Sequence, residues 1–308
     1  MIKQPINSAE FDHYIKLIQD SSRQLMPLPV NLPDKWKALI PKKEEPVLNG
    51  IKAVLFDLYG TLFISAAGEI SAGTTSEEML IPVAPEAIPE MTGYFHSTVK
   101  QSHEKARSQG IAWPEVRVEE LWAAYKGAVP PEWKPAQNMH GRELALRYEL
   151  AINPVYPMPH VQEALRSLAA GGILLGIISN AQFYTPLLFN AFFNASPAEL
   201  GFNTDLLIYS FEEKEAKPSP RLFNKARESL AKKNIRQEET LFVGNDMKND
   251  ITAAANAGFI TALFAGDNRS LRLRENDPAC AGVKPRFILN DLLTLLIPET
   301  VLKCQILE

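Results

Sequence analysis

The most constraining feature of this sequence is the stretch KAVLFDLYGTL at residues 52–62. Its apolar residues 53–56 form a short continuous run, which is typical of a strand buried on both faces of a parallel sheet. Asp57 follows this run directly, which places its carboxylate at the carboxyl edge of the sheet, where open α/β folds bind ligands. Asp57 is therefore a candidate nucleophile, and the alternative is an acidic residue that only begins a turn or caps a helix.

Strand-like and helix-like patterns alternate in the second half of the chain. Buried-strand patterns cover residues 173–178, 206–210, 240–243 and 260–264, and helical patterns cover residues 161–169, 220–232 and 250–257. Strands that alternate with helices form a parallel sheet covered on both faces. The sequence therefore predicts an α/β fold with a doubly wound parallel sheet and a Rossmann-like core.

The chain between residues 66 and 159 departs from this alternation. It holds few strand-like runs and three helical patterns, at residues 90–108, 118–126 and 141–150. We therefore expect a core formed by residues 51–65 and 160–297, with residues 66–159 as a helical insertion. Four aromatic residues of the insertion are expected to pack inside a helical bundle, with a substrate cage as the alternative: Trp113, Trp122, Tyr125 and Trp133. Three histidines of the insertion lack the spacing of metal-binding motifs: His96, His103 and His140.

The two ends of the chain are assigned no chemistry. Apolar residues at helical spacing predict a helix from Ser8, as its N-cap, to Leu25, and five prolines between residues 26 and 47 predict an extended strap. Residues 1–50 are therefore interpreted as a docking helix and a strap, unless the strap lies across the mouth of the active site or at a subunit contact. Residues 298–308 form a C-terminal tail, and no oligomeric state is predicted.

The composition favours a small-molecule partner. The 308 residues carry a formal net charge of -4, and no run of lysine and arginine is dense enough to predict nucleic-acid binding. The arginines at residues 268–274 are interpreted as a solvated loop, with contact to a second anionic group as the alternative. The two cysteines are far apart, and no apolar run approaches the ~18 residues of a membrane span. We therefore expect a cytoplasmic protein without a nucleic-acid or membrane partner.

Polar residues follow four of the predicted strands. They are Asp57 after the first, Ser179 and Asn180 after the second, Lys217 in the loop after the third, and Asp246 and Asp250 after the fourth. Because the carboxyl ends of parallel strands meet at one edge, we expect these side chains to lie together. Each has an ordinary alternative, such as a helix cap or a helix entry, but their combination favours one site.

In this order the motifs DLYGT, SN, KPSP and GNDMKND resemble those of the haloacid dehalogenase-like hydrolase superfamily. The resemblance covers residues 51–65 and 161–264, and the insertion resembles the helical cap that this superfamily places between its first and second motifs. The resemblance implies a role for each motif residue. Asp57 would be the covalent nucleophile, Thr61 would orient the first loop, Gly60, Ser179 and Asn180 would contact the transferred group, and Lys217 would steady nucleophile and substrate.

The same resemblance implies a Mg²⁺ site. Asp57, Asp246 and Asp250 would hold the ion, with Tyr59 also in the set. Asn245 is the alternative to Asp246, because the commonest fourth motif begins Gly-Asp and here an asparagine follows the glycine. A divalent cation offsets the repulsion between a carboxylate and a phosphoryl dianion, and hard oxygen ligands suit Mg²⁺. We therefore expect a Mg²⁺-dependent phosphohydrolase of a small phosphorylated metabolite that forms an aspartyl-phosphate.

Tyr59 is the main departure from the superfamily pattern. Most of its phosphatases carry a second aspartate there as general acid and base, and a phenol with an ordinary pKa of about 10 is poor in both roles. The superfamily's haloacid dehalogenases carry tyrosine at this position, and a halide leaving group needs no proton. The pair Asp246 and Asp250 argues for the phosphatase, because dehalogenation needs no metal. The alternatives are a 2-haloacid dehalogenase that uses the same Asp57 and a non-catalytic ligand-binding protein on this fold.

Overall fold

The computed structural model of the chain describes residues 6–42, 47–70, 87–130, 133 and 141–296. The predicted C-terminal tail and His140 lie outside this part of the chain. Among the described residues, no helix combines the length and the apolar character that crossing a bilayer requires.

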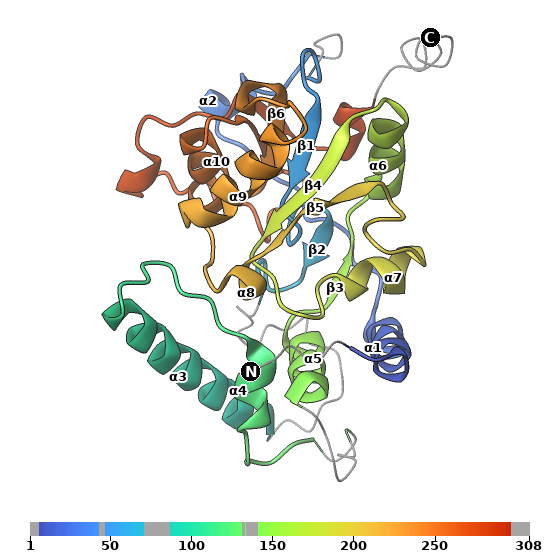
Figure 1. Cartoon of the computed structure of the whole chain (residues 1–308), viewed down its shortest axis with the longest axis vertical. Coiled ribbons are helices and arrows are strands. Elements are labelled where there is room, and N and C mark those ends of the chain that lie inside the picture. The colour runs from blue at the N-terminus through green and yellow to red at the C-terminus, as the bar shows by residue number, and fades with distance from the viewer. Residues whose placement is uncertain (1–5, 43–46, 71–86, 131–132, 134–140, 297–308) are drawn as a thin grey trace.

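The centre of the described structure is a six-stranded sheet in the order β5-β4-β1-β6-β7-β8 (Figure 1). Every neighbouring pair in this sheet is parallel, so the carboxyl ends of the strands lie at one edge. The strands are β1 (Ala53–Phe56), β4 (Leu174–Ser179), β5 (Phe202–Tyr209), β6 (Thr240–Gly244), β7 (Ile260–Phe264) and β8 (Phe287–Leu289). The predicted α/β fold with a parallel sheet is confirmed.

The side chains of β1 alternate between two hydrophobic cores, one on each face of the sheet. Val54 and Phe56 pack with side chains of α6 and α7, whereas Ala53 and Leu55 pack with side chains of α9 and α10. All four are fully buried, as the apolar run predicts. The covering helices are α6 (Val161–Ala170), α7 (Leu187–Phe193), α9 (Pro220–Ala231) and α10 (Ala253–Asn256), and the short α8 (Ser210–Glu213) follows β5.

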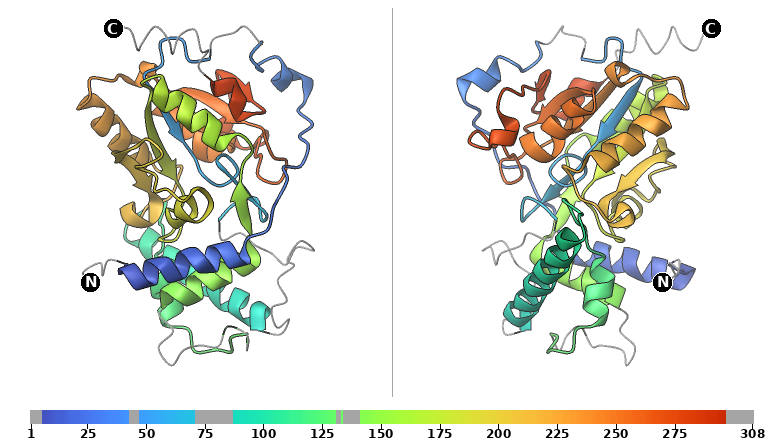
Figure 2. Two further views of the ribbon diagram at one scale, coloured as in Figure 1. Left: turned by 90° about the vertical axis from the view of Figure 1, so that its right-hand side faces the viewer. Right: turned by 60° about the vertical axis from the view of Figure 1, so that its left-hand side comes forward.

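Three helices, here called the insert helices, lie together beside the carboxyl edge of the sheet (Figures 1 and 2). They are α3 (Ala87–Ser108), α4 (Val118–Ala123) and α5 (Gly141–Ile152). Two short antiparallel strands, β2 (Phe63–Ser65) and β3 (Val155–Pro157), connect them to the core. These strands and β8 were not predicted, because three residues are too few to show a periodicity.

Aromatic side chains fill the space between the insert helices. Trp122 stacks on Phe95 with ring centroids 5.8 Å apart, and its ring lies 4.6 Å from that of Tyr148. Trp122, Tyr125 and Trp133 are buried, which agrees with the packing interpretation. Trp113 is 40% exposed, so that interpretation is wrong for this residue.

The N-terminal helix α1 (Ser8–Ser21) bridges the insert helices and the core (Figure 2). The Arg142 guanidinium of α5 lies 3.6 Å from the Glu10 carboxylate, and Gln19 donates a hydrogen bond to the Ala191 carbonyl of α7 at 3.0 Å. The prediction of Ser8 as N-cap is wrong: Asn7 and Glu10 form a capping box, which places the cap one residue earlier. The helix also ends before Leu25.

The strap after α1 runs along the core. The Leu28 N–H donates to the Asp267 carboxylate at 3.0 Å, and the Asn268 N–H donates to the Leu28 carbonyl at 3.1 Å. The strap includes one short helix, α2 (Asp34–Lys37). None of its described residues lines the cavity at the carboxyl edge of the sheet, and a role for the strap at a subunit contact stays a prediction.

The segment after β6 differs from the predicted helix at residues 250–257. Residues Met247–Thr252 form a π-helix, and only Ala253–Asn256 continue as an α-helix. The Thr252 hydroxyl donates to the Met247 carbonyl at 2.7 Å inside this wider turn. Short π-helical turns are frequent at functional sites, and this one contains Asp250 of the fourth predicted motif and is capped by Asp246.

Candidate active site

Asp57 lies directly after β1, in the middle of the carboxyl edge. Its N–H donates to the Val243 carbonyl at 2.9 Å, which continues the pairing of β1 with β6. Its Oδ1 accepts hydrogen bonds from the Ser179 hydroxyl at 2.8 Å and from the Lys217 ammonium at 2.6 Å. Among the described residues, none donates a hydrogen bond to Oδ2. One oxygen is therefore fixed in place, and the other is left for a reaction in the cavity that Asp57 lines.

Lys217 is a buried cation between two carboxylates. Its Nζ lies 2.6 Å from Asp57 Oδ1 and 2.5 Å from Asp250 Oδ1, and its backbone N–H donates to Asn180 Oδ1 at 2.7 Å. Burial alone would lower the pKa of Lys217, but the attraction of Asp250 and Asp57 outweighs burial and raises the pKa. Lys217 therefore stays charged at neutral pH.

Asp250 carries a perturbed carboxyl group. Burial raises the pKa of Asp250 to about 7; the Lys217 charge opposes this rise, and the charges of Asp57 and Asp246 add to it. Its Oδ2 accepts the Asp246 N–H at 2.9 Å. Gly244 permits this packing, because a Cβ there would lie 2.5 Å from Asp250 Cγ.

The two alternatives for the fourth motif lie side by side but differ in their partners. The Asp246 carboxylate pairs with the Arg274 guanidinium at 2.7 Å and caps the π-helix by accepting the Lys248 N–H at 2.7 Å. The Asn245 Oδ1 accepts from the Thr61 hydroxyl at 3.1 Å. Both residues line the cavity, so both stay candidates for a metal ligand.

The turn after Asp57 explains Gly60 and Thr61. Gly60 has a φ of +85°, and a Cβ there would lie 2.4 Å from Ser270 Cβ, so both the conformation and the space require glycine. Thr61 is fully buried and orients Asn245 of the neighbouring loop. The roles of Gly60, Ser179 and Asn180 as contacts of a transferred group stay predictions, and in the structure the Ser179 hydroxyl donates to the Asp57 carboxylate.

The Tyr59 hydroxyl is turned away from Asp57 and lies 3.0 Å from the Thr185 hydroxyl. Burial raises the pKa of Tyr59 well above its ordinary value, and the charge of Glu149 adds to the rise. The phenol therefore remains protonated and gives no base at neutral pH.

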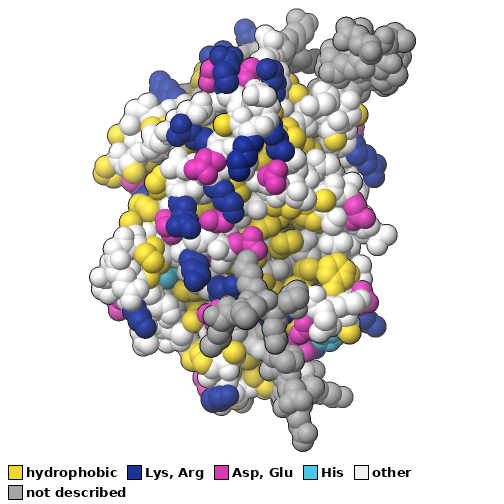
Figure 3. Space-filling view, viewed as in Figure 1, with side chains coloured by type: hydrophobic (Ala, Val, Ile, Leu, Met, Phe, Trp, Pro, Cys, Tyr) yellow, Lys and Arg dark blue, Asp and Glu magenta, His cyan; other side chains and the backbone are white. Residues whose placement is uncertain are grey.

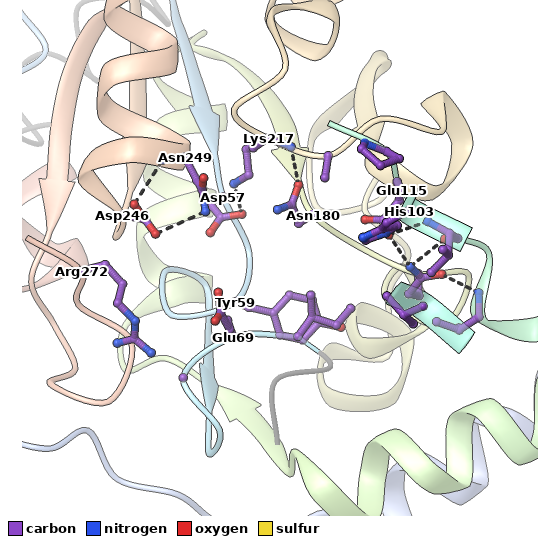
Figure 4. Close-up of a pocket in the computed structure, with 18 of the residues that line it drawn as sticks. Asp57, Tyr59, Glu69, His103, Glu115, Asn180, Lys217, Asp246, Asn249 and Arg272 are labelled. Carbon is purple, nitrogen blue, oxygen red and sulfur yellow. Dashed lines mark hydrogen bonds and ion pairs between the residues drawn. The ribbon is translucent and has the colours of Figure 1, made fainter. Parts of the chain in front are cut away.

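A cavity of about 520 Å³ lies between the carboxyl edge and the insert helices (Figure 4). The predicted site residues that line it are Asp57, Tyr59, Asn180, Lys217, Asn245, Asp246 and Asp250, whereas Gly60, Thr61 and Ser179 lie behind this lining. In Figure 4, Asp57, Lys217 and Asp246 lie on the core side, and Glu115 and His103 lie toward the insert helices. Such a volume suits a small metabolite. Figure 3 shows basic and acidic side chains interspersed over this face of the molecule.

The cavity also holds residues that the sequence did not single out. The loop with Glu115 bridges to the Lys217 loop, because the Glu115 N–H donates to the Lys214 carbonyl at 3.1 Å. The Glu115 carboxylate accepts from the Ser210 hydroxyl at 2.7 Å, and burial raises the pKa of Glu115 to about 7 against these hydrogen bonds. No local pattern marks a lone acidic residue in a loop, so only the fold could reveal it.

The arginine loop at residues 268–274 is not the solvated loop that was expected. Arg274 pairs with Asp246, Arg269 lies 3.1 Å from the buried Asp267, and Arg272 lines the cavity. The Met247 N–H donates to the Arg272 carbonyl at 2.9 Å, so the loop is paired with the acidic motif. That long-range pairing, invisible in the local composition, brings the arginines to the site.

A parallel sheet with an aspartate, a lysine and an acidic loop at its carboxyl edge is typical of proteins with an open α/β sheet that bind their ligands at this edge. More narrowly, the chain belongs to the haloacid dehalogenase-like hydrolases, because the model of that family matches residues 51–258. It is therefore an enzyme of the hydrolase class.

Curated relatives of this chain include phosphoglycolate phosphatases. The protein of Photorhabdus laumondii is 28% identical over 240 residues, covering 76% of this chain and 89% of the relative. The protein of Salmonella paratyphi A is 30% identical over 220 residues, covering 68% of this chain and 80% of the relative. A solved 2-haloacid dehalogenase from Pseudomonas syringae is 20% identical with a TM-score of 0.46, covering 83% of this chain and 99% of that structure.

Proposed function

We propose that this protein is a Mg²⁺-dependent phosphohydrolase that acts on a small phosphomonoester through an aspartyl-phosphate on Asp57. The observation that carries this proposal is the excess of carboxylates over cations at this edge. Asp57 and Asp250 share Lys217, and Asp246, paired with Arg274, lines the same cavity, so three carboxylates face two cations. A carbon–halogen hydrolase has no use for this excess, whereas a phosphatase needs a cation there. The relatives named phosphoglycolate phosphatase support the same reading.

Asp57 supplies the nucleophile. Its Oδ2 attacks phosphorus while Oδ1 is held by Ser179 and Lys217, so that the attacking lone pair is aimed into the cavity. The new bond joins Oδ2 to phosphorus, and the ester P–O bond breaks. Water then attacks the same phosphorus, which releases phosphate and restores the carboxylate.

The residues present fit a Mg²⁺ ion. Mg²⁺ is commonly held by one or two carboxylates together with water and substrate phosphate oxygens, not by a full cage of side chains. In the described part of the chain no three acidic, histidine or cysteine side chains form such a cage. Asp57 with Asp246 or Asn245, and Tyr59 through its backbone carbonyl, would hold the ion. Asp250 is the further predicted ligand, and both its oxygens already accept hydrogen bonds, from Lys217 and from the Asp246 N–H. When bound, the ion supplies positive charge beside the transferred phosphoryl oxygens.

The leaving group receives little help from Tyr59, since burial raises the pKa of its phenol and Thr185 engages its hydroxyl. The departing oxygen takes its proton from water. Esters with good leaving groups are therefore expected to react fastest.

The test is hydrolysis of p-nitrophenyl phosphate with and without Mg²⁺. The wild type should release phosphate only with the metal, and Asp57→Asn should lower kcat by about 10³-fold or more, because it removes the nucleophile. Asp205→Asn is the matched control, because Asp205 lies on the surface with its side chain 66% exposed. Phosphate release by Asp57→Asn at the wild-type rate would refute the proposal.

The second candidate is a 2-haloacid dehalogenase. It is favoured because the Tyr59 hydroxyl is engaged by Thr185 and its raised pKa makes it a poor acid and base, which does not matter for a halide that leaves without a proton. Chloride release from 2-chloropropionate in EDTA, lost in Asp57→Asn, would establish this activity in place of the first. Release of neither phosphate nor chloride would support a ligand-binding protein without catalytic activity.

A further inference from the structure

Helix α3 presents a basic face to the cavity. Four basic residues at spacings of four, three and four lie on one side of the helix and line the cavity: His96, Lys100, His103 and Arg107. Lys105, on the same helix, points elsewhere, because 100° per residue places it about 200° from Arg107. This spacing matches no metal-binding motif, and only the fold shows that it faces the cavity.

These residues belong to the same cavity as the nucleophile. Its lining runs from Asp57 and Lys217 on the core side to Lys100 and Arg107 on the α3 side. A ligand that fills this cavity would therefore meet side chains of both sides. The transferred phosphoryl group already has its cations on the core side, so the basic face of α3 is available for a different part of the ligand.

The His103 imidazole gives independent evidence that a ligand binds at the basic face of α3. Its Nε2 is buried, and within the described residues no group forms a hydrogen bond with it. Buried polar atoms are normally hydrogen-bonded, and an orphan one calls for an explanation. Burial lowers the pKa of His103 and the charge of Arg107 adds to this, so the imidazole is short of a negative neighbour.

The acidic residues on this side of the cavity do not fill that place. The Glu115 carboxylate already accepts from the Ser210 hydroxyl at 2.7 Å and from the Val116 N–H at 2.8 Å. Glu104 lies on α3 itself. Its carboxylate is 4.0 Å from the exposed Lys100 ammonium, which is a weak contact.

We infer that α3 forms a second anion site, and that the substrate is a phosphomonoester with another anionic group, a carboxylate or a second phosphate, at its far end. This inference rests on the proposed function for the reacting phosphate. Arg107 and Lys100 attract the far group, and the His103 imidazole donates a hydrogen bond to it.

The experiment compares each anionic substrate with a neutral one of the same carbon chain length. The kcat/KM of the wild type should be about tenfold or more higher for 2-phosphoglycolate than for 2-hydroxyethyl phosphate, and for propane-1,3-diyl bisphosphate than for 3-hydroxypropyl phosphate, as expected for charged hydrogen bonds. The two anionic substrates distinguish a carboxylate site from a phosphate site. In Lys100→Gln/Arg107→Gln this preference should fall to about threefold or less, and Arg107→Lys should retain most of it.

Lys105→Gln is the matched control, because it removes the same charge from another face of the same helix and should keep the preference. A wild type without preference, or an equal loss in Lys105→Gln, would overturn the inference. If the protein hydrolyses none of these esters, calorimetric binding of 2-phosphoglycolate and 2-hydroxyethyl phosphate to Asp57→Asn tests the anion site by itself. Equal affinities there would refute the site, whereas a preference without turnover would leave it standing and refute only the proposed function.

Discussion

Replacing Lys217 with methionine should destabilise the protein in a pH-dependent way. The ammonium lies 2.6 Å from Asp57 Oδ1 and 2.5 Å from Asp250 Oδ1, and all three groups are buried. Removing one partner of a buried ion pair costs about 3–5 kcal/mol, because the remaining charge has lost its compensation. The loss is limited by protonation, since Asp250 already has its pKa raised to about 7 by burial.

The sign follows from the direction of this shift. A carboxyl group whose folded pKa lies above its unfolded value stabilises the fold at low pH and loses that contribution as pH rises through the folded pKa. Without Lys217 the pKa of Asp250 rises further, so the Asp250 carboxyl group of the variant keeps its proton above pH ~7, where that of the wild type has lost it. Over the two pH units above this point, the free energy of unfolding of the variant therefore falls by up to about 2.7 kcal/mol more than that of the wild type. Lys217→Met should therefore be destabilised by about 2 kcal/mol more at pH ~9 than at pH ~6.

Urea unfolding of both proteins in EDTA at the two pH values measures this difference. Lys225→Met is the control, because Lys225 pairs with Glu213 and its side chain is 44% exposed, so less than about 1 kcal/mol should be lost at either pH. In Lys217→Met/Asp250→Asn the pH-dependent part should vanish. An equal loss for Lys217→Met at the two pH values, or a loss as small as that of Lys225→Met, would show that the three buried groups do not interact as described.

Two further substitutions test the first loop. Tyr59→Phe removes the hydrogen bond to Thr185 and should lower the free energy of unfolding in urea by about 1 kcal/mol. The rate of p-nitrophenyl phosphate hydrolysis should change by less than about threefold. A large loss of rate would assign the phenol a part in the chemistry. Gly60→Ala forces a Cβ to 2.4 Å from Ser270 Cβ at a φ of +85° and should lower the free energy of unfolding by about 2 kcal/mol or more. Gly50→Ala is the control: Gly50 has a φ of +74° with nothing within 4 Å of its Cβ, so only about 1 kcal/mol of backbone strain is expected. Equal losses in the two variants would contradict the steric argument.

The parts of the fold that the sequence predicted are those in which the cause is local. The apolar run at 53–56 is followed by Asp57, and both the buried strand and the placement of the carboxylate depend on adjacent residues alone. The same holds for Lys217 and Asp250, whose loops follow recognisable strands. These residues do lie together in the structure.

The parts that the sequence did not predict depend on distant segments. Arg274 reaches Asp246 because residues 245–247 and 272 pair across a loop, and no spacing along the chain indicates that pairing. Glu115 reaches the cavity through a bridge between the insert and the Lys217 loop. The prediction of Ser8 as the cap failed for a local reason, because Asn7 competes for the same role with a better partner in Glu10. The roles of the site residues and a cytoplasmic location stay predictions.

The position of α1 limits how far the insert helices can move relative to the core. This helix fastens α5 to α7 through Gln19 and Arg142, on the side where β2 and β3 already join the insert to the core. The loop with Glu115, which follows α3, ties the insert to the core a second time through residues 214–216. We therefore expect that the insert helices can swing away from the core only if the hydrogen bonds of one of these two connections break.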